Sequence, residues 1–313
     1  MNNKKFVLGI DTSNYTSSVA AVSAEEDILC DERIVLNVEK GKRGLRQSDA
    51  FYMHMQNLPE LVEKTFGKLN AAEYSLAAIA VSSKPRPVEG SYMPVFNSGI
   101  SAARCLAAAL NVELFEFSHQ EGHMEAARYG TVPKCLSPFI FFHFSGGTTE
   151  ALLSDLSIVG GTMDISYGQL IDRVGVAMGL KFPCGSAMDE MASSYKGEIM
   201  NLPKIKVKDG YMNLSGLETF CIRETEYSSP DMLSASIFKS VADSIALSVR
   251  QLTSKYGIND FLFAGGVSSS NYLRKTLPGM LNNVNIYFGK RELSSDNAVG
   301  TAFLGLNSIS GYI

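Results

Sequence analysis

The feature that most constrains the fold is a strand-and-turn pattern that occurs twice in the chain. Residues 6–10 and 17–22 have the apolar and β-branched composition of two strands, and a Ser/Thr-rich turn joins them. The pattern restarts at 138–144, an apolar strand that ends in Ser-Gly-Gly-Thr-Thr and is followed by a hairpin partner at 150–153. Two units of similar design predict a pseudo-duplicated, two-lobe α/β protein.

Helical and extended patterns alternate around both hairpins. Pro59 interrupts the first helical pattern and marks a kink or a boundary there. The expected elements are helices at 48–69, 97–111, 171–180 and 233–256, strands at 28–35, 76–81, 112–117 and 261–264, and a final small-residue helix from Asp296.

The size and hydropathy of the chain fit two lobes with buried cores. It has 313 residues, of which 45% are hydrophobic, and such a chain can bury a sizeable core. We expect an N-terminal lobe at 1–116 and a C-terminal lobe at 117–313. The sequence contains no obvious 18-residue apolar run and no signal-peptide pattern at its start, so we expect a cytoplasmic protein without a membrane segment.

The charge of the chain bears on nucleic-acid binding. The net charge is -4, so no global basic field attracts RNA, and RNA binding needs a local patch or a partner protein. The two densest basic clusters lie at 39–46 and at 204–208, and solvated surface explains each of them better than RNA does. Five scattered cysteines without a CxxC pair argue against a disulfide framework.

Half of the four histidines lie in one pentapeptide, His119-Gln120-Glu121-Gly122-His123. Residues four apart share a helix face, so both imidazoles can meet one divalent ion, and Asp296 offers a third ligand. Two unrelated polar residues on an exposed helix are the alternative interpretation. Glu121 lies about 200° around the helix from His119, which does not fit the glutamate of a zinc peptidase.

Three turns have the composition of phosphate or ligand loops. They lie at 11–17, where Asp11 can hold a hydrated cation, at 145–149, and at 265–270. Each turn alone is explained by a tight connection between strands or between strand and helix. Together they resemble the cleft of the actin, sugar-kinase and heat-shock chaperone (ASKHA) superfamily, an RNase H-like fold with a ligand cleft between duplicated lobes.

Seven blocks extend this resemblance over nearly the whole chain. They are GIDTSNYTSS, SHQEGHMEAA, FHFSGGTTEALL, LIDRVGVAMGLKFPCGSAMDE, NLSGLET, LFAGGVSSSNYLR and SSDNAVGTA. In order and spacing they resemble the tRNA threonylcarbamoyladenosine transferase family, which is TsaD-like and was formerly called glycoprotease or O-sialoglycoprotein endopeptidase. The resemblance implies transfer of a threonylcarbamoyl group from its adenylate to the amine of a tRNA adenosine beside the anticodon.

The resemblance also implies site residues and partners. A divalent ion, iron or zinc, would be held by His119, His123 and Asp296, with TsaB-like and TsaE-like proteins and tRNA as partners and either a homodimer or a heterodimer as the assembly. No catalytic side chain is assigned. The residues expected to bind an adenine nucleotide or adenylate are His143, Phe144, Ser145, Gly146, Gly147, Asp172, Gly185, Asp189, Gly265, Gly266 and Ser270.

Several positions depart from the family pattern. Tyr15 and Thr16 stand where the family has an acidic pair, and only His54 is in register with a family block within 44–55. The Ser-Lys-Pro-Arg-Pro sequence at 83–87 replaces a Gly-Pro-Gly turn, and Ser270 replaces an asparagine. These changes keep two alternatives open. One is a divergent paralogue that binds metal and nucleotide but acts on another acceptor or serves as a partner or regulatory module, and the other is a phosphotransferase of the same superfamily.

Overall fold

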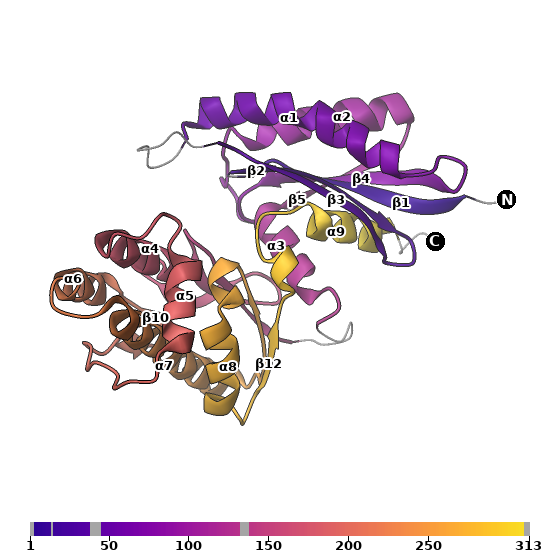
Figure 1. Ribbon diagram of the computed structural model, residues 1–313. Helices are drawn as coiled ribbons and strands as arrows, with labels where there is room; N and C mark the ends of the chain where they lie inside the picture. Colours follow the sequence, from indigo (N-terminus) through magenta and orange to yellow (C-terminus); the bar gives the residue numbers. More distant parts are fainter. Residues whose placement is uncertain (1–2, 14, 38–44, 132–137, 310–313) are drawn as a thin grey trace. The chain divides into compact units, whose positions relative to one another are not determined.

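The computed structural model describes residues 3–13, 15–37, 45–131 and 138–309 (Figure 1). The chain forms two compact units, Met1–Tyr129 together with Ser295–Ile313, and Gly130–Ser294. This division differs from the expected lobes at 1–116 and 117–313, because the histidine helix at 119–128 and the C-terminal helix both belong to the first unit. Most of the basic cluster at 39–46 and Cys135 lie outside the described residues.

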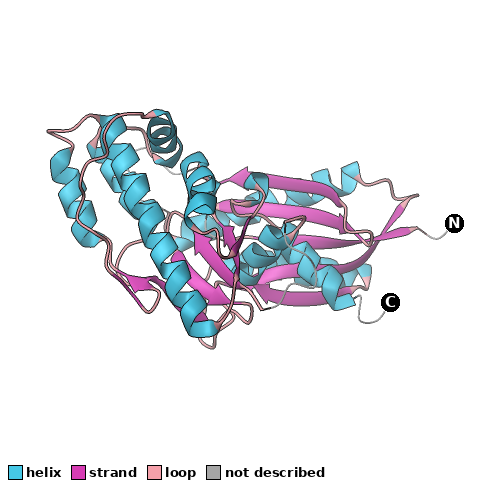
Figure 2. Ribbon diagram, turned by 90° about the horizontal axis from the view of Figure 1, so that it is seen from below, coloured by secondary structure: helices cyan, strands magenta, loops and turns pink. Residues whose placement is uncertain are grey.

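Unit 1 is built on a five-stranded sheet with the order β3-β2-β1-β4-β5. β1, β2 and β3 are antiparallel neighbours, whereas β4 and β5 join in parallel. In Figure 2 these strands lie side by side as magenta arrows. Their bounds are Lys4–Asp11, Thr16–Ser23, Ile28–Val35, Tyr74–Lys84 and Glu113–Ser118.

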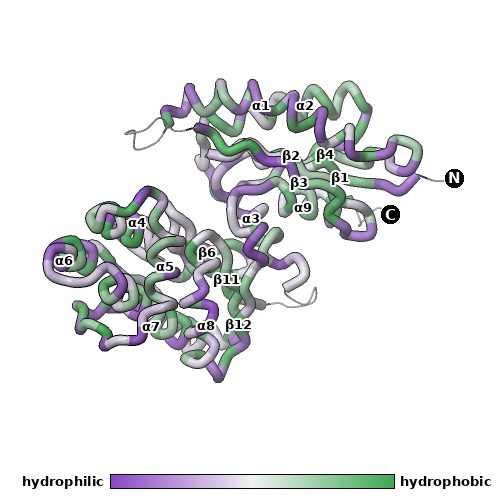
Figure 3. Tube along the Cα trace, in the orientation of Figure 1, coloured by the Kyte–Doolittle hydropathy of each residue, from purple (hydrophilic) through white to green (hydrophobic). Residues whose placement is uncertain are grey.

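Both faces of this sheet are covered by helices. Alternate residues of β1, namely Phe6, Leu8 and Ile10, share a core with residues of α1 (Gln47–Lys68) and α2 (Phe96–Leu110). At Gly9 the side-chain position lies on the other face, where an added Cβ would be 2.3 Å from the carbonyl oxygen of Ala298. Figure 1 shows α1 and α2 on one face and α9 (Val299–Ile309) on the other. β1 and β4 are accordingly largely green in Figure 3.

Pro59 is not a helix boundary, since α1 continues through it. Pro59 and Met55, four residues earlier, both lie on the exposed face of the helix. Water can therefore bond to the carbonyl group of Met55 that loses its helical partner. The last helix also differs from the expectation, because α9 begins at Val299 rather than at Asp296.

Unit 2 repeats the sheet order of unit 1. Its seven strands have the order β12-β11-β6-β7-β8-β10-β9, and the run β8-β7-β6-β11-β12 matches β3-β2-β1-β4-β5 in order and in direction. The predicted duplication is therefore confirmed. The strands are β6 Ile140–Phe144, β7 Thr149–Leu153, β8 Ile158–Thr162, β9 Val207–Lys208, β10 Tyr211–Met212, β11 Asp260–Ala264 and β12 Asn285–Phe288.

The helices of unit 2 enclose a core rich in phenylalanine. Phe142 stacks on Phe263 with 5.0 Å between ring centroids, which joins β6 to β11. The elements are α4 Tyr167–Ala177, α5 Gly185–Ser194, α6 Ser215–Glu224, α7 Pro230–Tyr256 and α8 Asn271–Met280, with short 3₁₀ helices η1 Gly266–Ser269 and η2 Arg291–Leu293.

One helix corrects the expectation that no segment is long and apolar enough to cross a membrane. By length and composition alone α7 qualifies, but 72% of its most apolar window is buried within the protein. Its apolar residues, including Phe238, Val241 and Ile245, belong to the core of unit 2. Burial explains its composition without a membrane.

Candidate metal centre and ligand loops

The histidine helix α3 (His119–Arg128) begins with a capping box. The hydroxyl of Ser118 accepts a hydrogen bond from the amide of Glu121, and the Glu121 carboxylate accepts one from the amide of Ser118 at 2.6 Å. This pairing satisfies amides at the start of the helix and fixes His119 as its first residue. Glu121 therefore serves the helix start, in agreement with the prediction that it does not act as a peptidase glutamate.

Two glycines bring α3 and α9 into close contact. A Cβ added at Gly300 would lie 1.9 Å from the carbonyl oxygen of Gly122. Just before α9, the side chain of Asn297 accepts a hydrogen bond from the amide of Val299 at 3.0 Å and so caps the helix. The cap explains why α9 starts later than expected, and it leaves Asp296 in the turn that faces α3.

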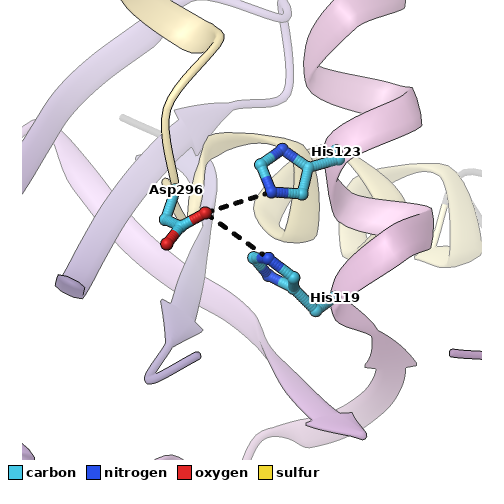
Figure 4. A group of neighbouring side chains, drawn as sticks. All are labelled: His119, His123 and Asp296. Carbon is cyan, nitrogen blue, oxygen red and sulfur yellow. Dashed lines mark hydrogen bonds and ion pairs between the residues drawn. The ribbon is translucent and has the colours of Figure 1, made fainter. Parts of the chain in front are cut away.

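His119, His123 and Asp296 meet within unit 1, as the sequence predicts (Figure 4). Nε2 of His123 lies 3.2 Å from Oδ1 of Asp296, and Nε2 of His119 lies 3.5 Å from the same oxygen. The three ligand atoms all lie within 4.8 Å of one another. An ion with four tetrahedral bonds of about 2.0–2.1 Å separates its ligand atoms by about 3.3–3.5 Å, so the donor set fits zinc or a related ion.

Asp11 contacts the candidate ligand His119 at the ring nitrogen that faces away from Asp296. Its Oδ2 lies 2.8 Å from Nδ1 of His119 and accepts a hydrogen bond from Ser82 Oγ at 2.6 Å. Its Oδ1 accepts from the amide of Ser13 at 2.8 Å. A carboxylate on the far nitrogen of a ligand histidine fixes the ring and leaves the other nitrogen for the metal. The sequence suggested Asp11 as a cation ligand, whereas the structure shows it as a partner of His119.

Negative charge dominates the cluster. Burial alone lowers the pKa of His119, but the carboxylates of Asp11 and Asp296 outweigh it and raise this pKa to about 10. Burial alone raises the pKa of Asp296, yet hydrogen bonds and charge from both imidazoles hold that pKa well below its usual range. The cluster therefore favours a bound cation, which is a proton on His119 or a metal ion in its place.

His54 and two of the segments that depart from the family pattern have structural partners in unit 1. The buried His54 lies with Nδ1 2.7 Å from Oγ of Ser17, which links α1 to β2. The backbone of Tyr15 accepts a hydrogen bond from Leu36 at 2.7 Å. In the turn at 83–87, the carbonyl of Pro85 accepts from the amide of Gln120 at 3.2 Å. This turn thereby satisfies a donor at the start of α3.

In unit 2, the turn between β6 and β7 is open. The amide of Ser145 donates to the carbonyl of Thr148 at 2.8 Å, and the amide of Thr148 donates to Oγ of Ser145 at 3.0 Å. A Cβ at Gly146 or Gly147 would meet nothing within 4 Å. The backbone of these glycines is therefore accessible to an anion.

Neighbouring segments hold this turn in place. Oγ of Ser166 donates to the carbonyl of Gly146 at 2.7 Å, and a Cβ at Gly265 would lie 2.4 Å from the carbonyl oxygen of Phe144. Phe144 is buried, and the buried ring of His143 stacks on Phe141 with 6.0 Å between centroids. The structure thus brings the predicted loops at 143–147 and 265–266 together, with Gly266 open on its side-chain side.

Asp172 and Gly185 also lie close together. Oδ1 of Asp172 accepts a hydrogen bond from the amide of Cys184 at 2.7 Å. Burial raises the pKa of Asp172, while the amides of Cys184 and Gly185 oppose that rise. A Cβ at Gly185 would meet nothing within 4 Å, so the backbone at the start of α5 is open.

Asp189 and Ser270, by contrast, are occupied by helix capping. Oδ2 of Asp189 accepts from the amide of Asn271 at 2.8 Å, and its Oδ1 accepts from the amide of Tyr272 at 3.0 Å and from the hydroxyl of Ser270. The Ser270 hydroxyl in turn accepts from the amide of Leu273 at 3.1 Å. These two residues hold α8 against α5 and so support the loop at 265–270.

Sequence reasoning missed two supporting side chains. Ser82, at the end of β4, hydrogen-bonds both to Asp11 and to Thr301, with 3.1 Å between hydroxyl oxygens in the second pair. Ser166 fixes the loop at Gly146. Ser166 has a local signal, since it forms a capping box with Gln169 at the start of α4. Ser82 has none, because its partners are far away in the sequence.

Comparison with known proteins identifies a family and a fold. The model of the family described as "TsaD: tRNA N6-adenosine threonylcarbamoyltransferase" matches residues 34–303. A tRNA N6-adenosine threonylcarbamoyltransferase of Streptococcus pneumoniae serotype 2 is 28% identical over 97% of this chain and 92% of its own length.

Solved structures agree on the fold. HypF from T. kodakarensis has a TM-score of 0.66 at 14% identity over 100% of this chain, which corresponds to 48% of the HypF chain. A second structure is the activator of the 2-hydroxyisocaproyl-CoA dehydratase from Clostridium difficile with bound ADPNP. It has a TM-score of 0.56 at 15% identity, and the match covers 98% of this chain and 96% of the activator chain. These similarities confirm the predicted ASKHA fold class.

Proposed function

The chain belongs to the TsaD family of tRNA N6-adenosine threonylcarbamoyltransferases, and we propose that it transfers a threonylcarbamoyl group from threonylcarbamoyl-adenylate to a tRNA adenosine next to the anticodon, in a metal-dependent reaction. The enzymes of this family are acyltransferases. The metal dependence is supported by one observation. The side chains of His119, His123 and Asp296 lie close together, and Asp11 contacts His119 on its other ring nitrogen.

The reaction needs little covalent work from the protein. The exocyclic amine of the adenosine attacks the carbamoyl carbon, a C–N bond forms, the C–O bond to the phosphate breaks, the amine loses a proton, and AMP leaves. A divalent ion, iron or zinc, would supply Lewis-acid stabilisation of negative charge when bound by His119, His123 and Asp296. The contribution of Asp11 is to orient the imidazole of His119.

We assign the binding of the adenylate to the open loops of unit 2. The amides at Gly146 and Gly147 suit phosphate oxygens, and the carboxylate of Asp172 suits ribose hydroxyls. Open space at Gly185 and Gly266 supports the same assignment. Asp189 and Ser270 make capping contacts, and we propose that they support the nucleotide-binding loop at 265–270.

The family also suggests the setting in which the protein works. We propose that it acts in the cytoplasm on tRNA and that TsaB-like and TsaE-like proteins assist it, in a homodimer or a heterodimer. The loss of the acidic pair at Tyr15 and Thr16 removes two charges from the first loop. We therefore expect the metal ligands and the loops of unit 2 to provide the main electrostatic contribution.

The test is a transfer assay with synthetic threonylcarbamoyl-adenylate, unmodified tRNA and the partner proteins, read out as modified nucleoside. We expect product with the wild-type chain and a loss of at least about 100-fold with Asp296→Ala. Asp27→Asn, an exposed change in the same unit, is the matched control and should retain activity. Absence of product from the folded, metal-loaded wild type would overturn the proposal.

The same assay, together with a measurement of ATP consumption, separates the remaining alternatives. Family membership favours the transferase over a non-catalytic paralogue and over a phosphotransferase. A paralogue with another acceptor would bind metal and adenylate but leave tRNA unmodified. A phosphotransferase would consume ATP in the presence of a small hydroxylated substrate, with or without tRNA.

A further inference from the structure

A basic groove at the edge of the second sheet takes no part in the site described above. The groove has a volume of about 1020 Å³ and lies wholly within unit 2. Ligand pockets measure roughly 300–1,000 Å³, so this groove is large for a single small anion and suits a segment of a polymer. Its walls include Lys204, Lys206, Lys208, Lys255, Met163 and Leu217.

Four lysines and one carboxylate, that of Asp209, line the groove, so its net charge is positive. Lys204, Lys206 and Lys208 are exposed and alternate with Ile205 and Val207, which pack against the core of unit 2. Side chains two residues apart along an extended chain point to the same side. Among the residues that the structure describes, none of the four lysines forms an ion pair with a carboxylate. The groove therefore attracts an anion.

Apolar side chains form the rest of the lining. Met163 is 73% exposed at the groove, which is unusual for a large apolar side chain, and Leu217 and Met212 lie buried beside it. Methionine adapts to varied apolar partners and is common on surfaces that bind peptides. The ligand should therefore carry apolar side chains as well as negative charge.

The groove also borders the edge of the second sheet. β9 (Val207–Lys208) is the last strand in the order of that sheet, and the carbonyl of Val207 accepts a hydrogen bond from the side chain of Gln251 at 2.9 Å. Because α7 engages the backbone at this edge, recognition of a ligand rests on the side chains of the groove.

We propose that this groove binds an extended acidic segment of a partner protein in which carboxylates alternate with apolar residues. Carboxylates two residues apart would face Lys204, Lys206 and Lys208, and the apolar residues would cover Met163. RNA fits less well, because single-stranded RNA sites rely on aromatic stacking and Tyr211 is the one aromatic residue in the lining. The inference does not depend on the proposed transferase reaction.

The test measures fluorescence anisotropy with a short labelled peptide in which glutamate alternates with leucine. We expect saturable binding to the full chain that is weakened about ten-fold or more in the double variant Lys204→Glu and Lys206→Glu. The matched control, Lys196→Glu with Lys275→Glu, makes the same charge change at two other exposed lysines of unit 2 and should bind as the wild type does. Circular dichroism checks that both variants are folded.

A second variant separates apolar recognition from charge alone. Met163→Ser should weaken the peptide about three-fold while leaving the four lysines in place. Equal binding of a peptide that alternates lysine with leucine would overturn the proposal. It would also be overturned if the groove and control variants bind equally, or if an oligouridine probe binds in a Lys204- and Lys206-dependent way while the acidic peptide does not.

Discussion

The two units share one sheet order but use the same positions differently. In unit 1 the end of the first strand is engaged in contacts, because Asp11 bonds to Ser13, Ser82 and His119. In unit 2 the corresponding turn after β6 is open at Gly146 and Gly147. In the duplicated fold, one strand end thus contacts the histidine helix α3, and the corresponding turn of the other unit is open.

Glycine shows the same contrast. Gly122 and Gly300 are required by the close contact of α3 with α9, whereas Gly146 and Gly147 have free space where a side chain would be. A glycine in unit 1 therefore contributes to packing, and a glycine in the unit 2 turn contributes to access. A substitution at Gly122 or Gly300 should therefore reduce stability. A substitution at Gly146 or Gly147 should reduce ligand binding and leave stability unchanged.

The largest effect is expected from Gly300→Ala. The new Cβ would lie 1.9 Å from the Gly122 carbonyl oxygen and 2.7 Å from the Ala126 amide, and neither backbone atom can move alone. The free energy of unfolding should fall by about 3 kcal/mol, as measured by urea denaturation. Gly67→Ala in α1, where a Cβ meets nothing within 4 Å, should be neutral or stabilising by about 0.5–1 kcal/mol. Equal effects of the two variants would disprove the packing argument.

The next effect concerns Asp11→Asn. The amide cannot supply the negative charge that orients His119, so the affinity for zinc should fall about 10–100-fold, as measured by competition with a chelator. The global fold should survive, because the amide oxygen can still accept from the amide of Ser13 and the hydroxyl of Ser82 can turn to accept from the new NH2 group. Asp27→Asn is the control, and unchanged zinc affinity in Asp11→Asn would show that Asp11 does not act through His119.

Gly147→Val tests the open turn of unit 2. Because a Cβ meets nothing at this position, the variant should keep its stability, while the affinity for an adenylate analogue falls about ten-fold, as measured by calorimetry. Zinc binding in unit 1 should not change. Gly279→Val, at another open glycine of unit 2, is the control. If nucleotide binding persists at full affinity in Gly147→Val, the turn does not hold the ligand.

The smallest expected effect is a pH dependence of stability that arises from Asp164 in unit 2. Asp164 accepts hydrogen bonds from the amides of Leu214 and Ser215, in a segment without counterpart in unit 1. Partial burial raises the pKa of Asp164, but these amides outweigh it and lower the pKa below 3.8. Its stabilisation is therefore present above pH 3.8 and is lost as the pH falls through the folded-state pKa.

Asp164→Asn should thus reduce stability by no more than about 0.5 kcal/mol near neutral pH, because exposed charges are screened. The difference from wild type should shrink toward zero as the pH falls below about 4, as measured by urea unfolding at a series of pH values. A difference that grows on acidification would contradict the assignment.

Local patterns predicted the five strands of unit 1, whereas β8 and β12 of the repeated run in unit 2 were missed. The strand at 28–35 was predicted with its observed bounds, and α1 was predicted within one residue at each end. Apolar periodicity predicts such elements because one face of each is buried. The two-residue strands β9 and β10 were missed, since so short an element has no period to detect.

Long-range features were predicted only in part. His119, His123 and Asp296 could be named because their types and a family resemblance point to a metal. The support from Asp11 could not be predicted, because it is 108 residues from His119 and their contact depends on how β1 and α3 meet. The lobe boundary was displaced for a similar reason, since nothing local signals that α9 returns to the first sheet.

The measurement that tests the central claim most directly is the metal content of three purified chains: wild type, Asp296→Ala and Asp172→Ala. The claim is that unit 1 alone holds the metal. We predict one divalent ion per chain in the wild type and in Asp172→Ala, and none in Asp296→Ala. An ion that is absent from the wild type, or that remains in Asp296→Ala, would contradict it.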